Sequence, residues 1–210
     1  VGLGSRVAAI TSTFTQGNLT HVENPFSVAL EGDGFFQIRT ESGELQYTRD
    51  GSFEISPVAN GNMLCTSDGN PVLDAYGNQI ILPSNRVATD LVVNQDGTLA
   101  FPDGTGNPAV ITDANGRPVK FGIYQFNNPA GLSKEGSNNY SVTVASGAAV
   151  AENGNAAVKQ TKTHQYYTEA SNVDVANEMV NLIVAQRAYE MNSKAIQASD
   201  EMMQQANALR

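Results

Sequence analysis

Four carboxylic acids come nearest to a catalytic set in this sequence: Asp33, Glu54, Asp74 and Asp90. Two carboxylates on a β scaffold can cleave a glycosidic bond, one as general acid and the other as base or nucleophile. No spacing singles out a pair among the four, and the sequence has no Trp to offer a large aromatic face to a sugar ring. We therefore assign no catalytic residue and keep a secreted carbohydrate-binding β-domain as a distant alternative.

The histidines and the single cysteine suggest little further chemistry. His21 and His164 lie far apart in the sequence, and neither has the neighbours of a metal site or of a Ser-His or Cys-His arrangement. Cys65 is alone, so an intramolecular disulfide or a cysteine metal cluster is excluded, and its flanking residues favour an inert position in a strand. We expect no enzyme activity, no metal and no cofactor.

Two glycine-containing segments resemble ligand loops only weakly. Residues 112–118, TDANGRP, have too few carboxylates for a calcium loop, and EGDGFF, residues 31–36, leads into an apparent strand where a phosphate loop would lead into a helix. We interpret both segments as turns.

Charge and hydropathy exclude several kinds of partner. The formal charge is −9, with only 12 Lys and Arg, which argues against a surface that follows nucleic-acid phosphates. No apolar run approaches the roughly 20 residues that cross a bilayer, and the start, VGLGSRVAAI, lacks the pattern of a signal peptide. We expect neither nucleic acid nor a small-molecule substrate as a partner, and no transmembrane segment.

Residues 20–155 have the pattern of a β-domain. Short apolar runs alternate with turn dipeptides that favour tight hairpins: Asp50-Gly51, Asn60-Gly61, Asp68-Gly69, Asp96-Gly97, Asp103-Gly104 and Asn115-Gly116. Phe36 and Ile38 alternate with polar residues, as do Val119, Phe121 and Ile123, which predicts strands with one buried face and one face in water.

The last 56 residues contain neither Pro nor Gly, which predicts one long helix. Ser171 can cap its first turn, with Asp174 as the acid of a capping box, so we expect the helix to begin near Asn172 or Val173. A helix of about 35 residues would be roughly 50 Å long.

Two apolar stripes run along this predicted helix. One repeats every seven residues and consists of Val175, Leu182, Tyr189, Ile196 and Met203. The other follows alternating spacings of three and four and consists of Val184, Ala188, Met191, Ala195, Ala198, Met202 and Leu209. At 100° per residue the stripes face nearly opposite ways, because Leu182 and Val184 are about 200° apart.

A long helix that is apolar on two sides must be covered on both. The β-domain can cover at most one side, so another chain or a missing segment is expected to cover the other; the alternative is a helix packed wholly within its own domain. The predicted fold class is mainly β with a long C-terminal α-helix: a compact all-β domain of short strands and hairpins plus a helical assembly segment. We divide the chain into a connecting segment at 1–20, a β-domain at 21–165 and the helix at 171–210.

The sequence QRAYEMNSKAIQASDEM, residues 186–203, resembles the C-terminal helix of the rod and hook proteins of the bacterial flagellum, and its YEMNSK core is most similar to subunits of the distal rod. Three further segments match in family order: TQGNL at 15–19, GDGFFQI at 32–38 and YTRDGSF at 47–53. The motif residues are Gly32, Gly34, Phe35, Phe36, Tyr47, Arg49, Asp50, Gly51 and Phe53.

This resemblance implies a structural subunit that polymerises into a rigid hollow drive shaft, transmits torque to the hook and lets exported subunits pass. It implies a homo-oligomeric tube, partners among proximal rod, hook and P- and L-ring proteins, and a place in the periplasmic rod reached by type III export without a cleavable signal peptide. Proximal rod or hook protein of the same family is the alternative. Family members begin with a helix that would cover one stripe; this sequence begins after it, and we expect a truncated chain.

Overall fold

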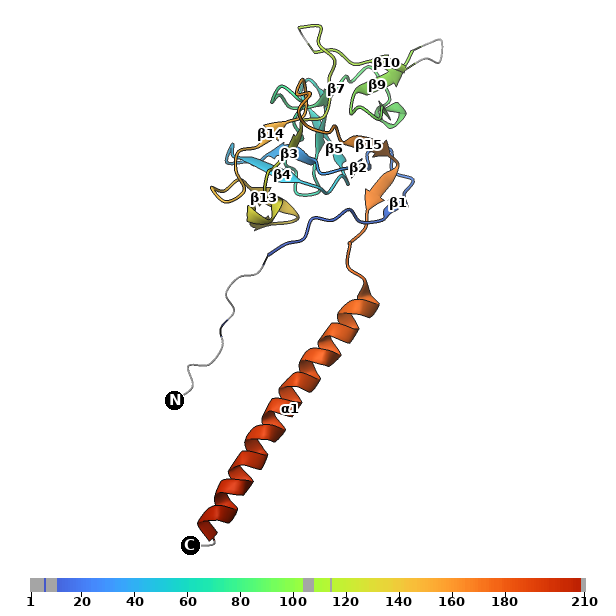
Figure 1. The fold of residues 1–210 in the computed structure, drawn as a ribbon. Helices are drawn as coiled ribbons and strands as arrows, with labels where there is room; N and C mark the ends of the chain where they lie inside the picture. The colour runs from blue at the N-terminus through green and yellow to red at the C-terminus, as the bar shows by residue number, and fades with distance from the viewer. Residues whose placement is uncertain (1–5, 7–10, 104–107, 114, 209–210) are drawn as a thin grey trace. The chain divides into compact units, whose positions relative to one another are not determined.

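The computed structural model describes residues 6, 11–103, 108–113 and 115–208. The chain forms two compact units, Val1–Ser171 and Asn172–Arg210. The first is built from short strands, and the second contains one long helix, α1, at the red end of the chain (Figure 1). The predicted fold class, mainly β with a long C-terminal helix, is confirmed.

The strands of the described residues are three to five residues long in most cases. They are β1 Leu19–His21, β2 Val28–Glu31, β3 Phe35–Arg39, β4 Leu45–Thr48, β5 Glu54–Val58, β6 Gly61–Cys65, β7 Ile81–Leu82, β8 Val92–Val93, β9 Leu99–Pro102, β10 Pro108–Val110, β11 Ile123–Gln125, β12 Ser133–Gly136, β13 Asn139–Ser141, β14 Val150–Ala151, β15 Lys162–Gln165 and β16 Tyr167–Glu169. Two 3-10 turns accompany them, η1 Ala88–Asp90 and η2 Pro129–Gly131.

The strands form small antiparallel sheets. The largest has six strands in the order β12-β13-β4-β3-β11-β14, and two others are β5-β6-β7 and β10-β9-β8. Two pairs join residues far apart in the sequence, β15 with β2 and β1 with β16. The second pair places residues 19–21 beside residues 167–169, so the sequence boundary drawn at residue 20 falls inside β1.

Strand β3 is buried on both faces, which corrects the prediction that its polar face lies in water. Phe36 and Ile38 belong to the larger apolar core, whereas Phe35 on the other face packs in a second cluster with Tyr47, Phe126 and Leu132. Gln37 is only 3% exposed. Its amide donates to the Tyr47 hydroxyl at 3.4 Å, a hydrogen bond that partly compensates for the loss of water.

Tight turns are present at most of the expected pairs that the structure describes, but Asp50-Gly51 is not a hairpin, because β4 and β5 on either side of it do not pair. Gly69, Gly97 and Gly116 have φ angles of 84°, 82° and 76°, which suit the second residue of their Asp-Gly and Asn-Gly pairs. Gly51 does not have a positive φ; glycine is required there because a Cβ atom would collide with the carbonyl oxygen of Val28. Gly104 lies outside the described residues.

Helix α1 extends from Val175 to Ala208, 34 residues, and none of them is buried. It begins two or three residues later than predicted, because Asp174 itself is the N-cap. The Asp174 carboxylate accepts a hydrogen bond from the backbone N–H of Ala176 at 2.9 Å and another from the Asn177 side chain at 2.8 Å. The expectation that Asp174 would be the acid of a capping box was therefore wrong.

Candidate functional site

The first apolar stripe is present on α1 and fully accessible. Its five side chains are exposed by amounts that range from 58% for Met203 to 78% for Tyr189. In order along the helix they are Val175, Leu182, Tyr189, Ile196 and Met203. The helix thus displays a seven-residue apolar repeat, a pattern that packs against other helices.

The second stripe is equally accessible. Val184, Met191 and Met202 are 61%, 67% and 65% exposed, and the small residues between them, Ala188, Ala195 and Ala198, are exposed as well. Leu209 lies outside the described residues. The small side chains leave room for a neighbouring helix to approach closely.

Three further large apolar residues of α1 were missed by the two-stripe description. Met179, Val180 and Ile183 are 61%, 58% and 49% exposed. At 100° per residue, Ile183 lies midway between Leu182 and Val184, so it connects the two stripes. The first third of the helix is therefore apolar around most of its circumference, a feature that a count of every large apolar residue finds and a heptad search does not.

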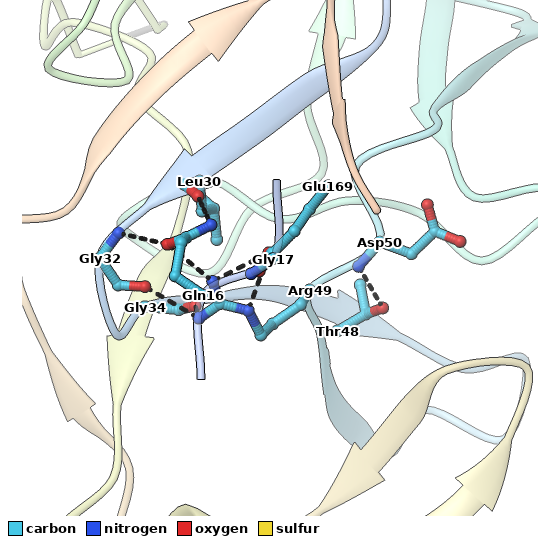
Figure 2. Close-up of polar contacts among 9 residues, drawn as sticks. All are labelled: Gln16, Gly17, Leu30, Gly32, Gly34, Thr48, Arg49, Asp50 and Glu169. Carbon is cyan, nitrogen blue, oxygen red and sulfur yellow. Dashed lines mark hydrogen bonds and ion pairs between the residues drawn. The ribbon is translucent and has the colours of Figure 1, made fainter. Parts of the chain in front are cut away.

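The family motifs of the β unit meet at Arg49, directly after β4 (Figure 2). Its Nε and Nη2 both donate to Oε2 of Glu169, at 3.1 and 2.9 Å. Nη1 donates to the carbonyl oxygens of Gly32 and Gly34, at 2.9 and 3.2 Å, and Nη2 also donates to Oε1 of Gln16, at 3.3 Å. These five bonds use all five N–H groups of the guanidinium.

Arg49's partners are also bonded to one another. Gln16 accepts from the backbone N–H of Gly32 at 3.0 Å and donates to the carbonyl of Leu30 at 3.0 Å. The second oxygen of Glu169 accepts from the backbone N–H of Gly17 at 2.8 Å. We call this network of Gln16, Gly17, Gly32, Gly34, Arg49 and Glu169 the Arg49 clamp.

The central ion pair of the clamp is largely buried, with side-chain exposures of 14% for Arg49 and 13% for Glu169. The guanidinium carbon lies 5.7 Å from the centre of the Phe35 ring. A pair taken so far from water gains little net stability, but removal of one partner leaves an unpaired charge and is costly. The clamp therefore fixes geometry more than it adds stability.

The other motif residues build the core beside the clamp. Phe36 and Phe53 pack with ring centres 5.0 Å apart in the larger core. Tyr47 packs against Phe126 in the second cluster, and burial raises the pKa of its hydroxyl. Asp50 accepts from the backbone N–H of Ser52 at 3.0 Å and so shapes the turn that contains Gly51.

Beside the clamp, the segments before β1 and after β16 run side by side. The ladder pairs Leu19 with Glu169 and His21 with Tyr167, and the N–H of Ala170 donates to the carbonyl of Asn18 at 2.9 Å. A Cβ atom at Gly17 would collide with the carbonyl oxygen of Ala170, so only glycine permits this close approach.

The four acids considered as glycosidase candidates lie on different segments. Asp33 is in the turn before β3, Glu54 begins β5, and Asp90 ends η1. Asp74 is 3% exposed and binds the backbone N–H groups of Tyr76 and Asn78, both at 2.8 Å, so it holds a turn. The turn bonds of Asp74 give it a structural role in place of a catalytic one.

The two histidines both contact the ring of Tyr167. His21 and His164 lie 5.3 and 6.2 Å from the ring of Tyr167, measured between ring centres. His164 Nε2 is 2.7 Å from Oε2 of Glu31, and this hydrogen bond is the main cause that lowers the pKa of the Glu31 carboxyl. Within the part of the chain that the structure describes, no group of three or more His, Cys, Asp or Glu could hold a metal ion.

A small β unit followed by a long helix with unburied apolar stripes defines a structural protein built to associate. Among the described residues, no helix is apolar over a length sufficient to span a bilayer. The flagellar basal body rod FlgEFG C-terminal model matches residues 164–209, and the flagellar hook protein FlgE/F/G D1 domain model matches residues 29–101.

Comparison with known proteins identifies the family. The chain is 39% identical to the flagellar basal-body rod protein FlgG of Borreliella burgdorferi, over 100% of this chain and 74% of that protein. It is 38% identical to the flagellar basal-body rod protein FlgG of Agrobacterium fabrum, over 96% of this chain and 71% of that protein. It is 34% identical to the flagellar hook-basal body complex protein FlhP of Bacillus subtilis, over 93% of this chain and 69% of that protein.

The chain belongs to the family of flagellar basal-body rod proteins and is a structural subunit of the rod. The resemblance found in the sequence is confirmed, and with it the location at the flagellar basal body.

Proposed function

We propose that this protein polymerises through α1 into the distal part of the rod and transmits torque along it. The observation that carries the proposal is the helix itself: 34 residues, none of them buried, with large apolar side chains on opposite sides. Burial of one such side chain contributes about 1.5–3 kcal/mol, so a repeated helix-to-helix contact can hold an axial polymer without a covalent link.

The partners that follow are further copies of this chain, and then the proximal rod, the hook and the P- and L-ring proteins. A heterologous contact repeated around an axis builds an open-ended tube in which many subunits share the load. The protein acts by packing and stiffness and catalyses no reaction; export through the type III apparatus delivers it to the growing rod.

The first test places a charge in the first stripe of the protein as produced from its gene. Leu182→Asp or Ile196→Asp puts an unpaired carboxylate into the proposed contact, at a cost above about 2 kcal/mol, and is expected to raise the critical concentration for assembly about thirtyfold or more. Sedimentation and electron microscopy measure assembly, and the β unit should retain its thermal unfolding transition.

Gln197→Asp is the matched control, because it adds the same charge to the same helix at a position that belongs to neither of the two stripes. It is expected to assemble like the wild type. Normal polymers from both stripe variants would show that this stripe is not an interface.

A hook or proximal rod subunit is the second candidate, because the family model over residues 29–101 is shared with hook proteins. The two functions predict different polymers. Electron microscopy of assembled protein separates them: a distal rod subunit forms straight rods, and a hook subunit forms curved ones.

A further inference from the structure

We propose that Arg49 is the positioning residue of a mechanical joint, which fastens β16, the strand that precedes α1 in the sequence, and the segment before β1 to the rest of the β unit. The proposal rests on the proposed function, because a joint matters only if the helix carries load. Its evidence is the Arg49 clamp, whose members come from four separate stretches of the chain, at residues 16–17, 32–34, 49 and 169 (Figure 2).

The strand pair at this place is too short to carry load by itself. The β1–β16 ladder has three residue pairs and forms a separate two-stranded sheet. Isolated two-stranded ribbons are at best marginally stable in water. Side-chain bonds from Gln16, Arg49 and Glu169 add the cross-links that the short ladder lacks.

The clamp lies immediately before α1 in the sequence. Ser171–Asp174, four residues, separate Ala170, whose backbone N–H is bonded to Asn18, from the first residue of the helix. A pull or twist on α1 therefore reaches residues 169 and 170 along the backbone. The ion pair then transmits the force from Glu169 to Arg49, which follows β4. The bond from Arg49 to the carbonyl of Gly34 transmits it to β3, an inner strand of the six-stranded sheet.

The N-terminal segment is fastened at the same point. Phe14 packs against Phe35 with ring centres 5.4 Å apart, and Gln16 and Gly17 bond to Arg49 and Glu169. Since both segments are tied to one guanidinium, neither can shift along the β unit without breaking the same bonds.

Arginine is required at position 49 because five acceptor contacts in three directions need its planar fork. Lysine carries three donors on one atom and cannot span Glu169 and the two glycine carbonyls at once. The low exposure of the pair keeps it from being screened by salt, so the joint holds at high ionic strength.

The test uses the complete gene product with Arg49→Gln, Glu169→Gln and the double variant. Arg49→Gln is expected to speed amide exchange at least tenfold at Gly17, Gly32 and Ala170, and to leave the core amides of Leu64 and Phe121 unchanged. The double variant should be less perturbed than the sum of the single ones, because it leaves no unpaired charge. Assembled Arg49→Gln rods should bend more than wild-type rods in electron micrographs.

Arg117→Gln is the matched control. Arg117 makes the same forked contact with a carboxylate, Asp113, at 3.0 and 2.8 Å, but both residues belong to one turn. Its loss should change neither the three clamp amides nor rod stiffness. If Arg49→Gln does not fold, Glu169→Gln and Arg49→Lys replace it, and each is expected to give a smaller increase at the same amides.

The outcomes separate the two proposals. Unchanged exchange at Gly17 and Ala170 in every clamp variant that folds, or an equal increase in Arg117→Gln, overturns the joint. Faster exchange with unaltered rod stiffness also overturns it. A wild-type protein that never polymerises overturns the proposed function, while the exchange data still decide whether the clamp fastens the two segments.

Discussion

At the scale of residues, burial determines the chemistry of the one cysteine. Cys65 is 5% exposed, and its thiol lies 3.5 Å from the carbonyl oxygen of Glu54. Burial, with a smaller contribution from the charge of Glu54, raises the pKa of the thiol. The thiol therefore stays protonated at neutral pH and is a poor nucleophile, since the thiolate is the reactive form.

Alkylation is accordingly expected to be slow in the native protein. Cys65 should react with iodoacetamide at pH 8 at least about a hundredfold more slowly in buffer than in concentrated urea, because reaction must wait for unfolding. Mass spectrometry follows the modification. Ser67→Cys in a Cys65→Ala background, placed in an exposed turn, should react rapidly; equal rates at the two positions would disprove protection by the core.

The sequence identified the motif residues but could not assign their roles. Gly32, Gly34 and Arg49 were recognised through the resemblance of two short segments to family motifs, whereas the carboxylate that binds Arg49 is 120 positions away, at Glu169. Gln16 lies in the matched segment TQGNL but was not named among the motif residues. A single sequence does not reveal that Arg49, Gln16 and Glu169 are neighbours. Their bonds depend on the β1–β16 ladder, which joins residues near the start of the chain to residues about 150 positions later.

At the scale of elements, Asp174 determines where α1 begins. From the sequence, Ser171 was expected to cap the helix and Asp174 to be the acid of a capping box, although both types of side chain can cap a helix. In the structure the helix begins at Val175, the Asp174 carboxylate accepts a hydrogen bond from the N–H of Ala176, and its negative charge faces the positive end of the helix dipole.

Asp174→Ala is expected to destabilise the first turn by about 1 kcal/mol, because the cap and its charge are both lost. Circular dichroism should show reduced helicity, and the amide of Ala176 should exchange faster. Asp200→Ala, an exposed change within the same helix, should leave helicity equal or slightly higher, since alanine is the better helix former. A matching loss in both variants would mean that Asp174 is not the cap.

Strand β3 shows the limit of periodicity at this scale. Alternation located a strand at Phe36 and Ile38 correctly, but it could not reveal that Gln37 is covered. Phe35, on the same face of β3, packs in a second cluster with Phe126 and Leu132, which lie far along the chain, and Gln37 itself bonds to the Tyr47 hydroxyl of that cluster. Periodicity indicates which residues of a strand share a face, but whether that face is exposed to solvent depends on tertiary packing.

At the scale of the whole molecule, the two units obtain their order from different sources. The β unit has its own cores, with Phe36, Phe53 and Phe121 fully buried. Helix α1 has no buried residue, so its order rests on propensity and on the Asp174 cap. Isolated helices are only marginally stable in water, and most helices in proteins are stabilised by packing of an apolar face.

Amide exchange of the free and the assembled protein should therefore differ almost wholly in α1. In dilute protein, amides from Val175 to Met203 are expected to exchange within about tenfold of the unfolded rate, whereas core amides such as Leu64 and Phe121 exchange slowly. In the polymer, both stripes lose contact with water, and the helix should become as slow as the core. Strong protection of the whole helix in a proven monomer would locate its stabilising contacts within one chain, and the apolar stripes would then have to be explained without neighbouring subunits.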